Sequence, residues 1–133
     1  MKTYQQLKDE AWRLYSLLMR INHMDEDGYV KCYTCSRVMK LNMSQGGHFL
    51  HRAIYSGLML HPDNSRPQCE ECNIHKNGNI NVFEKNLHEE IGDDRVNNLY
   101  NIRHSTPAPS RQELIEIIKD LKIKLKSKST CTK

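Results

Sequence analysis

The chain has 133 residues and a net charge of +4, with 38% apolar and 27% charged residues. This length fits one small domain, and with two Phe and one Trp it offers few large side chains for a core, so a bound metal would add needed stability. No stretch approaches the roughly 20 apolar residues of a membrane span, and the first residues lack the apolar segment of a secretory signal. We therefore expect a cytoplasmic protein without a membrane segment.

The N-terminal region is predicted to be one helix followed by a turn. Thr3 and Gln6 form the pattern of a capping box. Apolar residues then recur at helical spacing, which predicts a helix over residues 4–23. The acidic stretch that ends in Gly28 is typical of a turn. We assign residues 1–28 to this N-terminal helix.

Two Cys-x-x-Cys pairs, Cys32 with Cys35 and Cys69 with Cys72, are separated by 33 residues. Four thiols match the ligand count of a closed tetrahedral zinc site, which stabilises a fold and takes no part in chemistry. Cytoplasmic thiols stay reduced, which favours a metal over disulfides. Chance pairing of reduced cysteines and an iron–sulfur centre are the alternatives. We interpret the fifth cysteine, Cys131, as a stray thiol in the tail.

The segment between the cysteine pairs is predicted to hold short strands and a long loop. Alternating apolar residues on both sides of the first pair predict a strand, a metal-binding knuckle and a second strand. Gln45 and two glycines form a flexible corner that leads to a further strand over residues 48–51. Residues 52–67 lack periodicity, and a loop of this length in a small domain is often functional.

The chain after the second cysteine pair is predicted to be helical. A helix begins at Cys69, is interrupted at Gly78 and resumes over residues 80–91. A shorter helix follows, with Asp93 or Asp94 as its cap.

The C-terminal region is a linker followed by a basic helix. Residues 104–109 contain two prolines and form the linker. Ser110 and Glu113 repeat the capping-box pattern at the start of an amphipathic helix. Residues 110–133 hold seven basic and three acidic side chains, an excess equal to the whole net charge. This excess suits a polyanionic partner, and a solubilising tail is the equal alternative.

Three polar residues within the four-cysteine frame are candidates for phosphodiester chemistry. Such cleavage needs a base that activates water and a divalent cation that stabilises negative charge. A neutral histidine serves as base at pH 7, and Mg²⁺ or Mn²⁺ takes oxygen ligands. His48 is our candidate base, and Asn73 is our candidate ligand. Asn64 lies in the loop between them, where its amide could hold the His48 strand in register.

The order of these motifs resembles the NinG/Rap recombination proteins of lambdoid bacteriophages and, more widely, the HNH nucleases. The resemblance covers roughly residues 8–105. It implies an α+β fold with a small zinc-stabilised ββα-metal (treble-clef) core over residues 29–103, flanked by N- and C-terminal helices. The matching stretches are Cys32–Cys35, Gly47–Phe49, Arg52, Asn64, Gln68–Cys69, Cys72–Asn73 and Gly78–Asn79.

The resemblance implies that the protein is a metal-dependent, structure-specific DNA endonuclease that acts on branched recombination intermediates such as Holliday junctions or D-loops. His48 would be the general base, Asn73 a ligand of the catalytic cation, and Asn64 the residue that organises the loop. The protein would be phage-encoded and would act in the cytoplasm of a bacterial host. A resolvase acts on two strands, so we expect a homodimer, with the N-terminal helix as candidate interface.

The chain departs from the wider HNH pattern at Gly47, where many relatives place an Asp or His that binds the catalytic metal. Asn77 lies four residues after Asn73 on the expected helix, so it is our candidate for a further ligand of the cation. Other nearby residues that could contribute are His51, His75 and Asp63.

Basic residues near the candidate site are predicted to contact DNA phosphates without reading base sequence. Arg52, Arg66 and Lys76 are these candidates. The main alternative function is a non-catalytic zinc-finger-like module that binds DNA or protein, because the expected acidic ligand is absent. A thiol oxidoreductase is a weaker alternative, because neither Cys-x-x-Cys pair lies beside a βαβ pattern.

Overall fold

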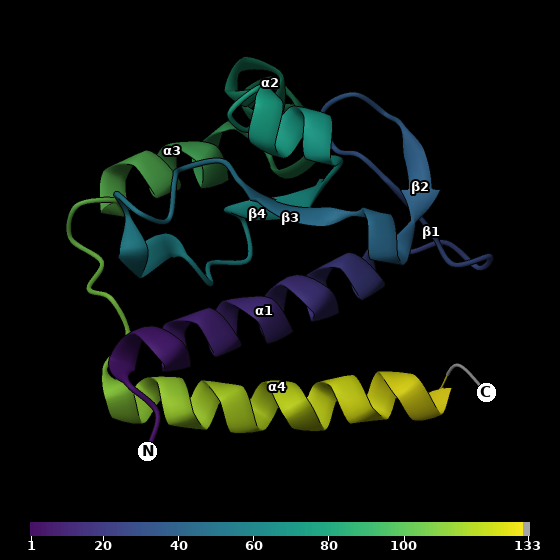
Figure 1. Ribbon diagram of the computed structural model, residues 1–133. Coiled ribbons are helices and arrows are strands. Elements are labelled where there is room, and N and C mark those ends of the chain that lie inside the picture. The colour runs from purple at the N-terminus through teal and green to yellow at the C-terminus, as the bar shows by residue number, and fades with distance from the viewer. Residues whose placement is uncertain (132–133) are drawn as a thin grey trace. The chain divides into compact units, whose positions relative to one another are not determined.

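A computed structural model describes residues 1–131, with side chains through residue 128 (Figure 1). The side chain of Cys131, interpreted above as a stray thiol, lies outside this description. None of the helices in the described part of the chain is long and apolar enough to cross a membrane. The elements are α1 (Tyr4–Asn22), β1 (Tyr29–Lys31), β2 (Val38–Lys40), the 3-10 helix η1 (Leu41–Met43), β3 (Gln45–His48), the 3-10 helix η2 (Ser56–Leu58), β4 (Ser65–Gln68), the π-helix η3 (Glu71–His75), α2 (Ile80–Ile91), α3 (Asp93–Ile102) and α4 (Arg111–Cys131).

The chain divides into two compact units. One unit contains Met1–Leu18 and Pro109–Lys133, and the other contains Met19–Ala108. Helix α1 extends beyond the first of these segments, to Asn22. The unit of residues 19–108 holds all the candidate site residues.

Both predicted capping boxes are present in the smaller unit. At the start of α1, the backbone N–H of Gln6 donates to Thr3 Oγ1 at 3.1 Å, and the N–H of Thr3 donates to Gln6 Oε1 at 2.8 Å. At the start of α4, the N–H of Glu113 donates to Ser110 Oγ at 3.1 Å, and the N–H of Ser110 donates to Glu113 Oε1 at 2.9 Å. Each box satisfies backbone donors that a helix start leaves without partners, so both helices begin where the sequence predicts.

The smaller unit is held together by the apolar faces of α1 and α4, which run side by side (Figure 1). The hydroxyl of Tyr4 donates to the carbonyl of Pro109, and Lys122 forms an ion pair with Glu10 at 3.4 Å. The buried apolar residues are Leu7, Ala11 and Leu14 in α1 and Leu114, Ile118 and Leu121 in α4.

The larger unit contains two antiparallel hairpins. Strand β1 pairs with β2, with the first cysteine pair in the connection between them. Strand β3 pairs with β4, with Gln45 opposite Gln68 and Gly47 opposite Arg66. A backbone hydrogen bond of 2.9 Å from Tyr33 to β4 joins the two hairpins. The cysteine knuckle is therefore fixed directly to the sheet that carries His48.

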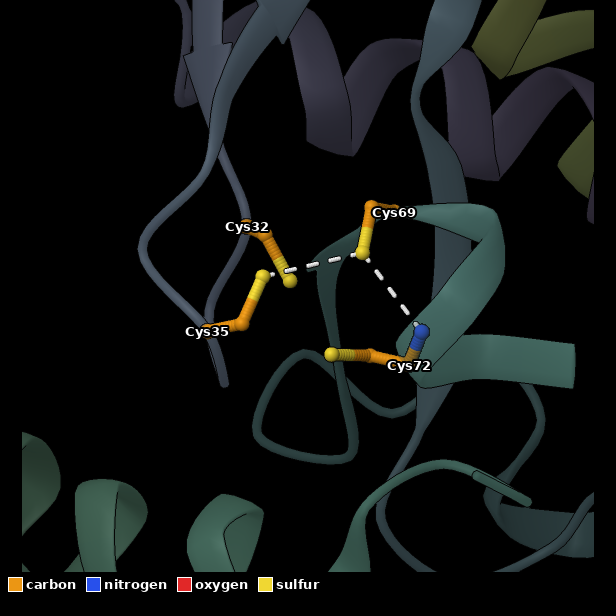
Figure 2. Close-up of side chains that lie close together, drawn as sticks. All are labelled: Cys32, Cys35, Cys69 and Cys72. Atoms are coloured by element: carbon orange, nitrogen blue, oxygen red, sulfur yellow. Dashed lines mark hydrogen bonds between the residues drawn. The ribbon is translucent and has the colours of Figure 1, made fainter. Parts of the chain in front are cut away.

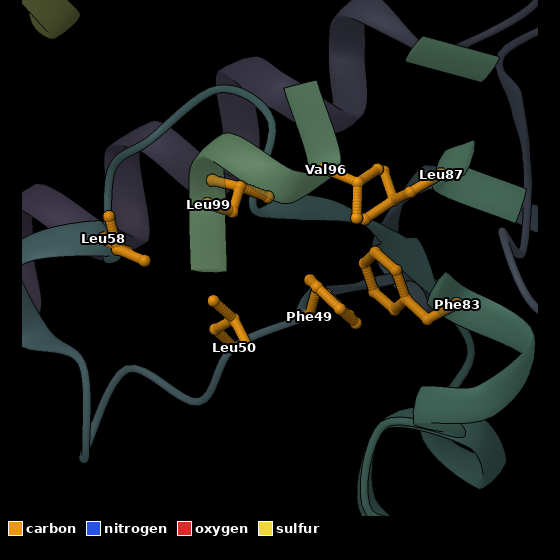
Figure 3. Close-up of a cluster of buried hydrophobic side chains, with 7 residues drawn as sticks. All are labelled: Phe49, Leu50, Leu58, Phe83, Leu87, Val96 and Leu99. Atoms are coloured by element: carbon orange, nitrogen blue, oxygen red, sulfur yellow. The ribbon is translucent and has the colours of Figure 1, made fainter. Parts of the chain in front are cut away.

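The core of the larger unit lies where α2 and α3 pack on the segment that follows β3 (Figure 3). Phe83 is fully buried, and its ring centroid lies 5.1 Å from that of Tyr33 and 5.9 Å from that of Phe49. Burial of these rings anchors the chain immediately after His48. The buried members of the cluster are Phe49, Leu50, Leu58, Phe83, Leu87, Val96 and Leu99.

The structure corrects the strand predicted over residues 48–51 and the loop predicted over 52–67. The strand is Gln45–His48, so the two glycines pair within the sheet and form no corner. Its partner, Ser65–Gln68, falls in and just after the predicted loop, and all four of its residues are buried. Because β4 is mostly polar and buried on both faces, it lacks the apolar alternation that indicates a strand.

The helix predicted to begin at Cys69 is instead the short π-helix η3, Glu71–His75. Asn77 and Asn79 both have a φ of 50°, a left-handed backbone that interrupts a helix. Helix α2 then begins at Ile80, as predicted. The break thus covers residues on both sides of Gly78.

Candidate functional site

The four cysteines of the two pairs meet at one point in the larger unit (Figure 2). Their sulfur atoms all lie within 4.8 Å of one another, and the Sγ atoms of Cys35 and Cys69 are 3.7 Å apart. Zn–S bonds of about 2.3 Å in a tetrahedron place the sulfurs about 3.8 Å apart. The four thiols therefore fit a structural metal such as zinc, which confirms the predicted clustering.

Backbone geometry around the first pair explains why these thiols converge. The N–H of Cys32 donates to the carbonyl of Arg37 at 2.7 Å, and the N–H of Ser36 donates to the carbonyl of Cys32 at 3.0 Å. Ser36 has a φ of 68°, so the turn after the pair uses a left-handed residue. This tight turn directs both sulfurs to the same side (Figure 2).

Donors around the second pair point at sulfur atoms. The backbone N–H of Cys72 lies 3.5 Å from the Sγ of Cys69, and the side-chain amide of Asn79 lies 3.8 Å from the Sγ of Cys72. The hydroxyl of Thr34 lies 3.6 Å from the Sγ of Cys32. Donors directed at the sulfur atoms of metal ligands are typical of the residues that surround a metal site.

His48 ends β3, opposite Ser65, with its ring half-buried. Its Nε2 lies 2.9 Å from the carbonyl oxygen of Met59. A carbonyl accepts only, so Nε2 carries the proton and Nδ1 is the basic nitrogen. The pKa of His48 is lowered to about 4, chiefly by burial and also by the charges of Arg52 and His51, and the hydrogen bond to Met59 opposes this shift. The ring is therefore neutral at pH 7, as a general base must be.

Asn64 is fully buried and joins two parts of the loop that follows His48. Its Oδ1 accepts from the backbone N–H of Leu50 at 2.8 Å. Its Nδ2 donates to the carbonyls of Leu50 at 2.9 Å and Leu58 at 3.1 Å. Three hydrogen bonds to backbone fix this loop next to β3, where Met59 meets His48.

Asn73 lies in η3 and is tied to β3 through a side chain. Its Nδ2 donates to Oε1 of Gln45 at 2.8 Å, which fixes the orientation of the amide. Its Oδ1 accepts no hydrogen bond from the residues that the structure describes, so this oxygen is the candidate ligand atom. Asn77 is exposed in the turn after η3, so the helical spacing that associated it with Asn73 does not apply.

Among the described side chains, no group of three or more potential metal ligands gathers around His48. Across the described side chains, the four cysteines are the only group of three or more His, Cys, Asp and Glu residues arranged to hold a metal ion. Asp63 pairs instead with Arg95, whose Nε lies 3.1 Å from the carboxylate, and this pairing lowers the pKa of Asp63. His51 and His75 are exposed and belong to no such group.

Of the three basic residues predicted to contact DNA, Arg66 is placed inside the fold. It is 5% exposed, and its guanidinium donates to Glu90 at 3.0 Å and to the carbonyl of Pro62 at 2.9 Å. This position does not favour the predicted DNA contact of Arg66, which stays a prediction. Arg52 is half-buried and Lys76 is exposed, and their role stays a prediction.

Sequence reasoning gave no positioning role to two glutamines near the site. Gln45 holds Asn73, and Gln68 is fully buried between the cysteine knuckle and β3. The only signal in the sequence was the position of Gln68 immediately before Cys69.

Comparisons with known proteins identify the family. A family model described as "Bacteriophage Lambda NinG protein" matches residues 1–130. Searches of curated proteins and of solved structures found no match. The match spans nearly the whole chain, including the cysteine cluster and His48, and confirms the resemblance to NinG. The chain belongs to the bacteriophage lambda NinG family.

Proposed function

We propose that the chain is an endonuclease that hydrolyses DNA phosphodiester bonds at branched recombination intermediates such as Holliday junctions or D-loops. The proposal rests on the state of His48: its ring is neutral at pH 7 and is held by a hydrogen bond to the Met59 carbonyl. It lies on a strand joined to a four-cysteine centre. The branched substrate is the one that the resemblance to NinG/Rap proteins implies.

The two kinds of site have separate roles in this proposal. The cysteines bind one structural zinc, because four thiolates leave no open position for substrate or water. The knuckle, β3, β4 and η3 form the treble-clef frame that the HNH resemblance implies. His48 lies outside the cysteine cluster and is free of any role as a zinc ligand in it.

His48 acts on water in the proposed reaction. Nδ1 takes a proton from water as its oxygen attacks phosphorus, and the P–O bond to the leaving oxygen breaks. The leaving oxygen is the 3′ oxygen, so the products carry 5′-phosphate ends. A divalent cation, Mg²⁺ or Mn²⁺, would supply positive charge that stabilises the leaving oxygen. Asn73 offers Oδ1 to that cation, and DNA phosphates and water would fill the remaining positions.

Positive charge for DNA binding comes from the site and from α4. Arg52 is close enough to His48 to lower its pKa, so the guanidinium can meet a phosphate near the base. Lysines along α4, with the tail, account for a basic excess that favours binding to any DNA sequence. We expect the protein to bind branched DNA as a homodimer.

A non-catalytic zinc module that binds DNA or protein is the second candidate. It is favoured by one observation, the lack of a carboxylate cluster around His48 among the described side chains. The two candidates differ in whether the protein cleaves DNA.

The test is cleavage of a labelled synthetic four-way junction by zinc-loaded protein with Mg²⁺ or Mn²⁺. A linear duplex of the same sequence is the substrate control, and His104→Ala is the matched variant because His104 is exposed on the linker. We expect the junction to be cut in preference to the duplex, and His48→Ala to reduce the rate by about 10²–10⁴-fold. His104→Ala should cut at the wild-type rate.

Two outcomes would decide against the proposal. Cleavage by His48→Ala at the wild-type rate would remove His48 as the base. Binding of the junction without cleavage, under every cation tested, would favour the non-catalytic module.

A further inference from the structure

Position 47 requires a glycine because there is no room for a Cβ atom, and not because of its backbone conformation. Its φ is not among the positive values found at Gly28, Gly78 and Gly92. A Cβ placed on Gly47 would lie 1.8 Å from Oε1 of Gln68 and 2.6 Å from its Cδ. Real Cβ atoms do not approach other atoms this closely, so any larger residue at position 47 must displace the Gln68 side chain.

Gln68 is held too firmly to move aside without loss. It is fully buried, and its Nε2 donates to the hydroxyl of Thr34 at 3.0 Å and to the carbonyl of Gly78 at 2.8 Å. The acceptor at Gly78 fixes which end of the amide carries nitrogen. Displacing the amide would leave buried polar groups without partners, which destabilises a fold.

The two partners of Gln68 belong to the elements that surround the candidate site. Thr34 lies within the first cysteine pair, and its hydroxyl lies 3.6 Å from the Sγ of Cys32. Gly78 follows η3, and a Cβ placed on it would lie 3.6 Å from the carbonyl oxygen of His48. One amide therefore links the cysteine knuckle, the turn after η3 and the strand that carries His48.

The remaining atom of this amide is directed at Gly47. Oε1 of Gln68 is buried and has no hydrogen-bond partner among the described residues. Because it occupies the direction of the absent Cβ, it lies against the Cα of Gly47. A Cα–H···O contact is a weak interaction and is open there only to glycine.

We propose that Gly47 and Gln68 are a matched pair, in which Gln68 is a positioning residue that couples the cysteine centre to the His48 strand. The amide fills the space of a side chain at position 47, so this position supplies no ligand to a catalytic cation. The glycine at position 47 is thus required by the packing of the Gln68 amide, and does not mark the loss of a carboxylate ligand. The effect on catalysis rests on the proposed nuclease function, whereas the packing of the pair does not.

The first test is the thermal stability of zinc-loaded variants. We expect Gly47→Ala and Gln68→Ala each to lower the Tm by on the order of 10 °C. In the Gln68→Ala background, Gly47→Ala should lower the Tm by less than about 2 °C further, because the space is then open. Gln112→Ala is the matched control, since Gln112 is exposed on α4 and its effect should add to that of Gly47→Ala. Additive losses for Gly47 and Gln68 would overturn the pairing.

Two further variants keep this test decisive. If Gln68→Ala does not fold, Gln68→Asn shortens the side chain by one methylene and should relieve the same clash. Gln68→Met fills the same space but makes no hydrogen bonds. In the Gln68→Met background, Gly47→Ala should therefore lower the Tm by as much as it does in the wild type. Equal tolerance of Gly47→Ala in the Met and Asn backgrounds would contradict the steric account.

The positioning role is read from the His48 ring by ¹⁵N NMR. The wild-type ring should show a protonated Nε2, as its bond to Met59 requires. We expect Gln68→Asn to change this tautomer population and to lower kcat on the junction by about tenfold or more with KM unchanged. An unchanged ring spectrum would overturn the role of Gln68. The NMR and Tm readings need no cleavage, so they remain decisive if the protein proves not to be a nuclease.

Discussion

Asn64 gives the most quantitative test of how the fold holds the candidate site. Replacement by alanine removes three hydrogen bonds to the backbone of Leu50 and Leu58, at a position with no solvent exposure. A hydrogen bond contributes about 0.5–1.5 kcal/mol net, and a buried group left without a partner costs about 1–3 kcal/mol. Allowing for relaxation, we expect Asn64→Ala to lower the free energy of unfolding by about 3–5 kcal/mol.

Asn64→Asp separates the hydrogen bonds from the volume of the side chain. It keeps the shape and the acceptor but replaces the donating Nδ2 by an oxygen, which then faces two carbonyls. We expect a loss at least as large as that of Asn64→Ala, because a buried charge meets two acceptors. An apolar packing role would predict a smaller loss for aspartate than for alanine.

The assay is urea unfolding of zinc-loaded protein, followed by circular dichroism. The control is Asn101→Ala, since Asn101 is exposed near the end of α3 and should change stability by less than about 0.5 kcal/mol. A loss below about 1 kcal/mol for Asn64→Ala would refute the view that its hydrogen bonds fix the loop beside His48.

Three further predictions follow from the same structure. Cys69→Ser should abolish binding of one zinc per chain, and chelation of the metal should unfold the larger unit, as read by metal analysis and circular dichroism. Arg66→Ala should lower the free energy of unfolding by about 2–4 kcal/mol. Arg52→Ala should lower it by less and should weaken DNA binding with a smaller salt dependence; a larger loss of stability for Arg52→Ala than for Arg66→Ala would contradict the placement of Arg66. The pKa of His48 is lowered from 6.5 to about 4, so its contribution to stability is full above pH 6.5 and is lost as the pH falls through about 4. The acid limb of kcat/KM should lie near pH 4, and an acid limb above pH 6 would contradict it.

The helices and the metal centre were predictable because their signals are local. Each capping box is a four-residue pattern, and both Thr3 with Gln6 and Ser110 with Glu113 make the expected bonds. The Cys-x-x-Cys spacing by itself indicates a metal-binding pair. The convergence of the two pairs on one site could therefore be predicted without knowing the structure of the chain between them.

Strand β4 and its neighbours were not predictable because they depend on contacts distant in sequence. The buried guanidinium of Arg66 donates to Glu90 and to the carbonyls of Pro62 and Ser65. Gln68 is buried because its partners Thr34 and Gly78 come from other elements. Buried polar residues whose hydrogen-bond partners are distant in sequence produce no hydrophobic pattern. A sequence segment that contains them therefore resembles an exposed loop.

The most direct test of the whole account measures zinc content and junction cleavage in one preparation of His48→Ala. If the cysteines fix the fold and His48 performs the chemistry, the variant stays folded and keeps one zinc per chain. Its cleavage with Mg²⁺ or Mn²⁺ should nevertheless fall by about 10²–10⁴-fold. Cleavage at the wild-type rate, or loss of zinc together with activity, would contradict this separation of roles.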